Sequence, residues 1–181
     1  MSPQNFEHMS DASYRMMVAV MDLEDFLFSH IEKRVNKFGI LPGSTVVDYG
    51  CGPGRYTIFY SRLAGPLGKV YAVDVHPIAI ELVNRKKETY GLTNVEAHLA
   101  DGYASGLPDG VADMVTALDM FFGIRDQKAF LAELKRITRP NGILVIDDGH
   151  QPRRATKSQI EAGGGWTIVE ETKDHLKCKP A

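Results

Sequence analysis

Residues 46–54 read Val-Val-Asp-Tyr-Gly-Cys-Gly-Pro-Gly, and this stretch decides the fold. An apolar strand ends there in an acid and is followed by three glycines at alternate positions. Glycine carries no side chain, so a ligand can lie directly against the backbone amides of such a loop. A second apolar segment, Lys69–Val75, carries Asp74 near its end, where a carboxylate can bind a ribose diol. Together the two segments predict a site for a nucleoside-bearing cofactor at the edge of an α/β sheet.

The composition is that of an ordinary globular chain of 181 residues, with 44% hydrophobic and 24% charged residues. The formal net charge of −2 gives no electrostatic reason to expect binding to nucleic acid or to an anionic membrane. The two cysteines, Cys51 and Cys178, form no CxxC motif, which favours a reduced, cytoplasmic setting. No apolar run approaches the length of a membrane span, and the first residues lack the pattern of a secretory signal.

Hydrophobic periodicity and turn residues predict strands that alternate with helices from about residue 45 onward. The expected strands are Thr45–Tyr49, Lys69–Val75, Val95–Leu99, Ala112–Leu118, Ile143–Ile146, Thr167–Glu171 and His175–Lys179. The expected helices between them are Tyr56–Ala64, Pro77–Tyr90, Gln127–Ile137 and Thr156–Ala162. The expected connections are a loop over residues 101–111, a turn at Pro140-Asn141-Gly142 and a tight hairpin turn at Lys173-Asp174.

Strand–helix alternation with short connections predicts a parallel sheet with helices on both faces, the doubly wound α/β class. The last two strands can only be antiparallel, because the loop between them is too short for a crossover. Two helical stretches precede the first strand, one capped by Ser10 and one carrying apolar residues from Phe26 to Phe38. We therefore expect a single domain, with residues 1–39 as a helical segment and residues 40–181 as a Rossmann-like core.

The glycine loop does not fit the usual dinucleotide fingerprint. Gly50 and Gly52 satisfy G-x-G-x-x-G, but the third glycine position holds Arg55. Asp48, directly before the loop, would repel a pyrophosphate and suits a cation such as an α-amino group or a sulfonium. An oxidoreductase that uses NAD(P) is therefore an alternative that these residues disfavour.

Four segments, Val46–Gly54, Ala72–Val75, Ala100–Gly102 and Leu134–Ile146, resemble the successive motifs of class I S-adenosylmethionine-dependent methyltransferases. The similarity is greatest to the small type 11 and ubiquinone/menaquinone-biosynthesis-like branch, and it covers about residues 40–148. It implies a seven-stranded Rossmann-like sheet with strand order 3-2-1-4-5-7-6, in which the last strand is antiparallel. It also implies S-adenosyl-L-methionine as cofactor and methyl transfer to a small-molecule acceptor at an O, N, S or C nucleophile.

The resemblance implies roles for the residues of the loop and of the next strand end. The methionine part of the cofactor would be lined by Gly50, Cys51, Gly52 and Gly54. Asp48 would hold its amino group through water, and Asp74 would accept hydrogen bonds from both ribose hydroxyls. Asp74 could also cap the helix that starts at Pro77, and the two roles can coexist.

Adenine recognition is expected farther along the same edge of the sheet. Val75 or His76 would stack on one face of the ring. Asp101 would accept from the exocyclic amine, with Gly102 beside it. His76 could equally lie at the surface, and Asp101 could be an ordinary turn residue of an Asp-Gly pair. Leu118, at the end of the fourth strand, would border the methyl group.

Four polar residues follow the fourth and fifth strands, where the acceptor would bind: Asp119, Asp147, Asp148 and His150. Metal-dependent catechol-type O-methyltransferases hold Mg²⁺ with an Asp after strand four and an Asp-Asn pair after strand five, and Asp119, Asp147 and Asp148 lie at similar places. We expect no metal, because Asp148 stands where Asn belongs in that pattern, and keep this triad as the metal-binding alternative. In two other interpretations, Asp147 and Asp148 cap the following turn and orient His150, or His150 or Asp119 acts as a general base.

The connections after the fourth and fifth strands are short, so no inserted substrate domain is expected. The acceptor is then a small molecule or is presented by a partner protein, and a homodimer is an alternative. The large apolar residues Phe6, Tyr14, Met16 and Met17 lie near where this fold usually covers its cofactor, so they could form a lid or simply pack in the core. A methyltransferase-like subunit that activates a partner without catalysis is the remaining alternative.

Overall fold

The computed structural model describes residues 9–27 and 31–181, and within them seven strands form one sheet. The strands are β1 (Thr45–Tyr49), β2 (Lys69–Asp74), β3 (Val95–Leu99), β4 (Ala112–Ala117), β5 (Thr138–Ile146), β6 (Trp166–Glu171) and β7 (Leu176–Pro180). The α-helices in the same ranges are α1 (Asp11–Leu27), α2 (Ile31–Val35), α3 (Thr57–Ala64), α4 (Pro77–Tyr90), α5 (Gln127–Ile137) and α6 (Arg153–Gly163).

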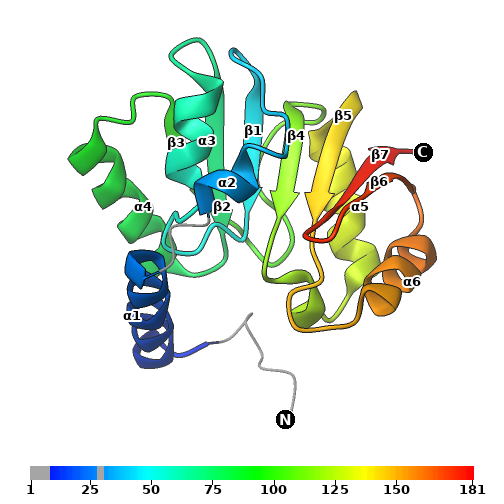
Figure 1. Cartoon of the computed structure of the whole chain (residues 1–181), viewed down its shortest axis with the longest axis horizontal. Coiled ribbons are helices and arrows are strands. Elements are labelled where there is room, and N and C mark those ends of the chain that lie inside the picture. The colour runs from blue at the N-terminus through cyan, green and yellow to red at the C-terminus, as the bar shows by residue number, and fades with distance from the viewer. Residues whose placement is uncertain (1–8, 28–30) are drawn as a thin grey trace.

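The strands are arranged in the order β3-β2-β1-β4-β5-β7-β6 (Figure 1). β7 is antiparallel to β5 and β6, and all other neighbouring strands are parallel. The predicted strand order and the predicted reversal of the last strand are therefore confirmed. Because β1, β2, β4 and β5 are parallel, their carboxyl ends meet at one edge of the sheet, which is the lower edge in Figure 1. That edge carries the site described below.

The sheet is buried on both faces. Adjacent residues of a strand point to opposite faces, so Val46 and Val47 belong to different cores. Val47 packs with side chains of α5 and α6 such as Leu134 and Ile160. Val46 packs with side chains of α2, α3 and α4, including Tyr60. Burial on both sides explains why these strands are nearly continuous apolar runs in the sequence.

Capping residues set the helix ends. Pro77 opens α4, where the His76 Nδ1 accepts a hydrogen bond from the Ile78 N–H at 3.3 Å. Gly91 ends the same helix in a left-handed conformation with φ of 62°. The Asp126 carboxylate caps α5. These signals are local, and the bounds that the sequence predicts for α4 and α5 are confirmed.

The prediction of a second helix through Phe26 and Phe38 is wrong. Phe26 belongs to α1, and α2 is a short helix that ends at Val35. The apolar residues Leu27, Ile31 and Val35 continue one helical spacing across the junction. Periodicity alone therefore does not reveal where one helix gives way to the next.

The turn predicted at Pro140-Asn141-Gly142 lies inside β5 and does not precede it. Ala112 of β4 pairs with Thr138, but Met114 pairs with Ile143, so β5 has extra residues at this point. Such an irregularity places turn residues within a strand without ending the strand. The pairing of the later part of β5 agrees with the predicted strand.

The other predicted connections are confirmed. Residues 101–111 form a loop between β3 and β4. Between β6 and β7, the Thr172 hydroxyl accepts hydrogen bonds from the N–H groups of Asp174 (3.2 Å) and His175 (3.0 Å), which closes the tight turn. None of the helices in residues 9–27 and 31–181 combines the length and apolar character that a bilayer crossing requires.

Leu134 of α5 is fully buried against the sheet. Leu134→Ala is expected to lower the free energy of unfolding by about 2–5 kcal/mol, because the substitution leaves a cavity in the core. Lys128→Ala, at an exposed position of the same helix, is the control and is expected to change it by less than about 0.5 kcal/mol. Denaturant unfolding measures both variants, and equal effects would contradict the packing described for α5.

Candidate active site

The glycine loop follows β1 and is hydrogen-bonded to the neighbouring strand β2. The N–H groups of Gly50 and of the next residue both donate to the Val73 carbonyl, at 2.8 and 3.1 Å. Gly50, Gly52 and Gly54 have φ angles of 74°, 52° and 81°, a left-handed conformation that favours glycine. A side chain at Gly50 would also collide with Met120. The left-handed backbone therefore favours glycine at these three positions of the loop.

Asp74 joins the glycine loop to the end of β2. Its Oδ2 accepts a hydrogen bond from the Gly52 N–H at 2.9 Å, and its Oδ1 accepts one from the His76 N–H at 2.8 Å. Burial raises the pKa of Asp74 above its ordinary value, and the two amide hydrogen bonds offset part of this shift. The side chain that caps α4 is His76, so the capping alternative for Asp74 is wrong.

Asp48 is buried beneath the same loop, with 3% of its surface exposed. Its carboxylate accepts hydrogen bonds from the hydroxyls of Thr57 (2.6 Å) and Thr116 (3.4 Å). Burial raises the pKa of Asp48 to about 7, and the two hydroxyls counteract only part of that shift. A cationic group beside this carboxylate would lower its pKa again, so the position suits the cation that the sequence predicts.

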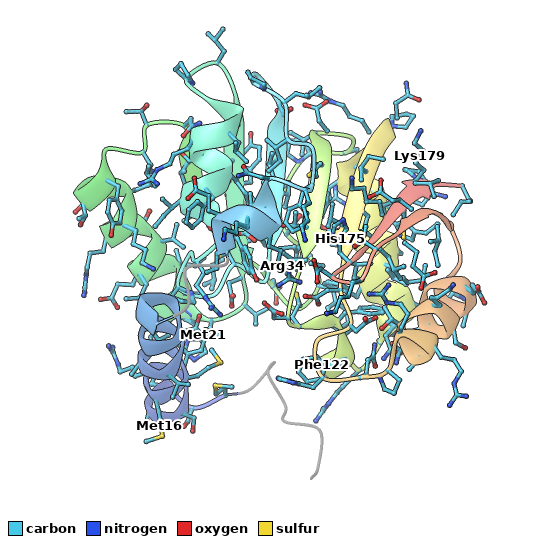
Figure 2. The ribbon with its side chains drawn as sticks, in the orientation of Figure 1. Met16, Met21, Arg34, Phe122, His175 and Lys179 are labelled. Carbon is cyan, nitrogen blue, oxygen red and sulfur yellow. The ribbon has the colours of Figure 1, made fainter. Side chains whose placement is uncertain are left out.

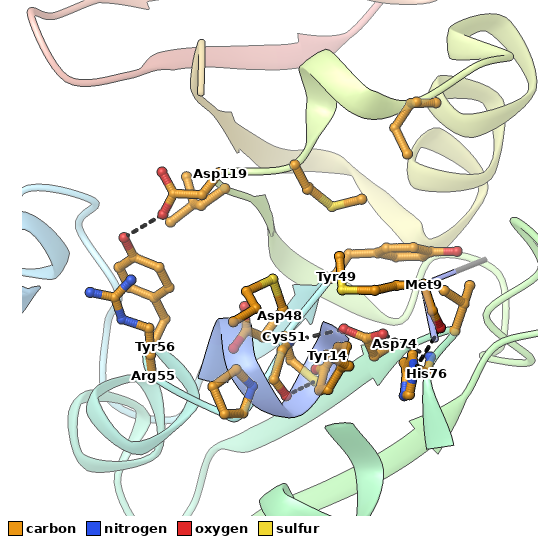
Figure 3. A pocket seen from close by; sticks show the side chains of 18 of the residues that line it. Met9, Tyr14, Asp48, Tyr49, Cys51, Arg55, Tyr56, Asp74, His76 and Asp119 are labelled. Carbon is orange, nitrogen blue, oxygen red and sulfur yellow. Dashed lines mark hydrogen bonds between the residues drawn. The ribbon is translucent and has the colours of Figure 1, made fainter. Parts of the chain in front are cut away.

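The loop and the two carboxylates open into one cavity at the carboxyl ends of β1, β2 and β4, which we call the cofactor cavity (Figure 3). The predicted cofactor residues that line it are Asp48, Gly50, Cys51, Gly52, Asp74, Val75, His76, Gly102 and Leu118. Gly54 and Asp101 are not among its lining. A Cβ at Gly54 would lie 3.2 Å from Val83, and Asp101 is exposed in a short bridge with Ala104. Asp119 adds a third carboxylate to the lining.

α1 supplies one wall of the cofactor cavity. Tyr14 is buried, with 4% of its surface exposed, and its ring stacks on His76 with the centroids 4.0 Å apart. Its hydroxyl has no hydrogen-bond partner within the part of the chain that the structure describes. Of the other predicted lid residues, Met17 lines the cavity, Met16 is 73% exposed, and Phe6 lies outside the described residues.

A second group of polar residues lies at the ends of β4 and β5. Asp119 has a φ of 58°, the one positive value outside glycine in the described ranges, and its N–H donates to Asp147 Oδ1 at 2.8 Å. Asp119 Oδ2 accepts a hydrogen bond from the Tyr56 hydroxyl at 2.9 Å (Figure 3). It accepts another from Arg34 Nη1 at 3.4 Å. Arg34, which comes from α2, also binds Asp147 through Nη2. One guanidinium is therefore shared by two neighbouring carboxylates.

The environment shifts the pKa values of the two carboxyl groups in opposite directions. Burial raises the pKa of Asp119, but the charge of Arg34 and the hydrogen bonds outweigh burial, so the net shift is downward. Burial and the nearby charge of Asp119 raise the pKa of Asp147 to about 7. The sequence does not single out Arg34 or Tyr56, because an arginine in a short basic helix is typical of a solvent-facing position.

His150 does not belong to this group, and Asp148 lies beside it with its carboxylate bound to Arg153. The Asp148 carboxylate accepts hydrogen bonds from Arg153 Nε, with both oxygens at 2.8 Å. His150 is exposed and contacts Phe122 edge to face, with the ring centroids 4.9 Å apart. The metal-binding alternative therefore lacks its third carboxylate. Across residues 9–27 and 31–181, no three His, Cys, Asp or Glu side chains are arranged to hold a metal ion.

Asp48 leads to a prediction about the pH dependence of stability. Its pKa rises from an ordinary value of 3.8 to about 7 in the folded protein, so the folded state binds this proton more tightly. The contribution of Asp48 to the free energy of unfolding of the ligand-free protein is therefore expected to fall as the pH rises from about 4 to about 7. Asp48→Asn, which is neutral at every pH, is expected to reduce this slope. Denaturant unfolding across that range measures it, and a wild-type slope in the variant would refute the burial argument.

A family model described as a methyltransferase domain matches residues 47–146. A demethylmenaquinone methyltransferase of Geobacillus stearothermophilus is 30% identical over 153 residues, which cover 81% of this chain and 62% of that protein. A demethylmenaquinone methyltransferase of Staphylococcus aureus (strain Newman) is 34% identical over 136 residues, which cover 72% of this chain and 54% of that protein. The chain therefore spans less than two thirds of the length of these curated relatives.

Two solved structures extend the similarity to nearly the whole chain. A SAM-dependent methyltransferase from Aquifex aeolicus superposes with a TM-score of 0.75 at 27% identity, over 90% of this chain and 95% of that one. A TehB-like SAM-dependent methyltransferase from Corynebacterium glutamicum has a TM-score of 0.74 at 15% identity, over 95% of this chain and 100% of that one. The second likeness shows a shared fold alone.

The residues of the cofactor cavity fit S-adenosyl-L-methionine, the cofactor expected for this family. The bare glycine loop leaves room for a ligand against the backbone, and Asp74 is a buried acceptor for a diol. The raised pKa of Asp48 marks a carboxyl group that a cation would stabilise in its charged form. The buried Tyr14 hydroxyl is a polar group that a ligand can satisfy. The family model, the relatives and the fold agree, and the chain belongs to the class I S-adenosylmethionine-dependent methyltransferases, in the branch that includes the demethylmenaquinone methyltransferases.

Proposed function

We propose that this chain transfers a methyl group from S-adenosyl-L-methionine to a small-molecule acceptor. The observation that supports this most directly is a bare glycine loop beside two carboxylates, Asp48 and Asp74, in one cavity. A sulfonium and an α-amino group are attracted to such a site, whereas the pyrophosphate of NAD(P) is repelled. Family membership and this charge pattern support the same cofactor.

Within this proposal, each part of the cavity has one task. The glycine loop receives the methionine part of the cofactor, with Asp48 beneath it, and Asp74 accepts from the ribose hydroxyls. Adenine lies against Val75, His76 and Gly102. We assign the adenine contacts to these residues because they line the cavity, whereas Asp101, the predicted acceptor from the adenine amine, is exposed outside it.

Methyl transfer requires little of the protein beyond the positioning of the cofactor and the acceptor. When bound, the cofactor supplies a methyl group on a positively charged sulfur, which is a good leaving group. With that cofactor bound, Asp119 would lie beside the acceptor, where it or water would take the proton that the acceptor loses. Leu118 and Asp119 border the cavity at the end of β4 and orient the acceptor there. The rate acceleration then comes from the alignment of the acceptor with the methyl group and from the exclusion of water.

The class of acceptor is a separate question. The names of the two relatives make a quinone one candidate acceptor. We keep the proposal at a small molecule, because the chain spans less than two thirds of those proteins. A screen of metabolite pools with methyl-labelled cofactor tests turnover. Cofactor binding without any labelled product would favour the alternative of a non-catalytic subunit.

Calorimetric titration with S-adenosylhomocysteine, with NADH as the comparison, tests the cofactor assignment. We expect S-adenosylhomocysteine to bind and NADH not to bind. Asp74→Ala is expected to weaken S-adenosylhomocysteine binding by at least ~1.5 kcal/mol, about tenfold, because charge-assisted hydrogen bonds are lost. Glu88→Ala removes the same charge at an exposed position of α4 and is expected to leave the affinity unchanged. Unchanged affinity in Asp74→Ala would contradict the role of Asp74.

We also propose that α1 covers the bound cofactor as a lid, with the Tyr14 hydroxyl as its polar contact. In the ligand-free protein this hydroxyl is buried without a hydrogen-bond partner among the described residues. Tyr14→Phe is therefore expected to raise the free energy of unfolding of the ligand-free protein by roughly 1 kcal/mol. It is expected to weaken S-adenosylhomocysteine binding by a similar amount, about fivefold. Met16→Leu, at an exposed position of α1, is the control, and a Tyr14→Phe variant that binds like wild type would exclude the contact.

A further inference from the structure

A second cavity, which we call the polar basin, opens beside the cofactor cavity. It is lined by residues of the segments 33–37, 147–149 and 173–174, together with Asp119. These segments belong to α2 and the residues after it, to the chain that follows β5 and to the β6–β7 turn. Because Asp119 lines both cavities, they meet at the end of β4. The polar basin is therefore next to the place where an acceptor has to reach the methyl group.

Every carboxylate of the polar basin already has a basic partner. Asp119 and Asp147 share Arg34, Asp148 is bound by Arg153, and Asp174 lies 2.8 Å from Lys37 Nζ. Each acidic side chain therefore already contacts a basic side chain, and Arg34 serves two of them. The polar basin therefore leaves no unpaired carboxylate for a cationic ligand among the residues that the structure describes.

Two lysines of the polar basin have no such partner. Lys33 comes from α2 and Lys173 from the β6–β7 turn, and both are exposed. Neither forms an ion pair with any residue in the described ranges. The Nε of Arg34, another residue of this lining, is buried without a hydrogen-bond partner in the same ranges. The charged groups of the polar basin that have no ion-pair partner among the described residues are therefore the two lysines.

We propose that the polar basin binds the methyl acceptor and that the acceptor is a small molecule with a carboxylate or phosphate group. Lys33 and Lys173 bind the anionic group, and the reacting atom lies beside Asp119, next to the cofactor cavity. This inference rests on the proposed methyl transfer and adds the class of substrate to it. An uncharged acceptor gains nothing from the two lysines, and an apolar one would desolvate the charges of the polar basin without replacing their hydration.

The test follows backbone amide signals in ¹⁵N–¹H NMR spectra of the full chain saturated with S-adenosylhomocysteine. Inorganic phosphate and 4-hydroxybenzoate are the anionic probes, and 4-hydroxybenzamide is an uncharged comparison of nearly the same shape. We expect both anions to shift the signals of Gly149 and Lys173. We also expect 4-hydroxybenzoate to bind at least about tenfold more tightly than the amide, because a charge-assisted contact is present only in the acid.

The double variant Lys33→Gln/Lys173→Gln removes both charges at exposed positions and is expected to weaken anion binding by about tenfold or more. Lys179→Gln is the matched control, because Lys179 is exposed and lies in β7 at the end away from the turn, apart from Arg34 (Figure 2). Three results overturn the inference: equal affinity for the acid and the amide, wild-type affinity in the double variant, or no shift with either anion.

If the proposed methyl transfer is wrong, the titrations give a pattern different from the one expected if only the anion site is wrong. Calorimetry with S-adenosylhomocysteine comes first, and the anion titrations are repeated without it. If S-adenosylhomocysteine does not bind but both anions still bind through the two lysines, the anion site stands and the proposed methyl transfer is refuted. If S-adenosylhomocysteine binds and the anions do not, the proposed methyl transfer stands and the inference about the acceptor is wrong.

Discussion

The ion pair of Arg34 with two carboxylates is the interaction on which the reactive edge of the sheet depends. Parallel pairing of β4 and β5 brings Asp119 next to Asp147. Two adjacent carboxylates repel each other, and burial increases the cost of their charge. Arg34 extends from α2 and binds both, while the Tyr56 hydroxyl donates to Asp119. Asp119 has a left-handed backbone conformation and lines both cavities. These bonds therefore also fix the position of the residue that the two cavities share.

The two cavities at this edge differ in how their carboxylates are stabilised, and this difference decides the charge of the ligand that each cavity favours. In the cofactor cavity, Asp48 is bonded to hydroxyls and Asp74 to backbone amides. Neither partner supplies a full positive charge, so both pKa values stay raised and a bound cation is favourable. In the polar basin, each carboxylate already contacts a basic side chain, and Lys33 and Lys173 remain for an anion. A cationic cofactor and an anionic acceptor can therefore bind side by side.

Both cavities take a wall from helices that precede residues 47–146, the part matched by the family model. α1 contributes Tyr14 to the cofactor cavity, and α2 contributes Arg34 to the polar basin. The sequence offers Tyr14 as either a lid residue or a core residue but does not indicate the function of Arg34, since a single charged residue in a short helix carries no distinctive spacing. It also proposes His150 as a general base, but in the structure His150 is exposed and lines neither cavity.

The sequence by itself determined which segments form strands and helices and which residues form the floor of the cofactor cavity, whereas the order of the strands was implied by the resemblance to the methyltransferase family. Apolar runs, capping residues and the glycine loop of Val46–Gly54 act through near neighbours in the chain, and Asp74 follows directly from the strand that carries it. Only the tertiary structure decided which charged side chains meet. Arg34 is 85 residues from Asp119 and 113 from Asp147. No local pattern encodes contacts over such separations, because the packing of helices against the sheet decides which side chains come within reach of each other.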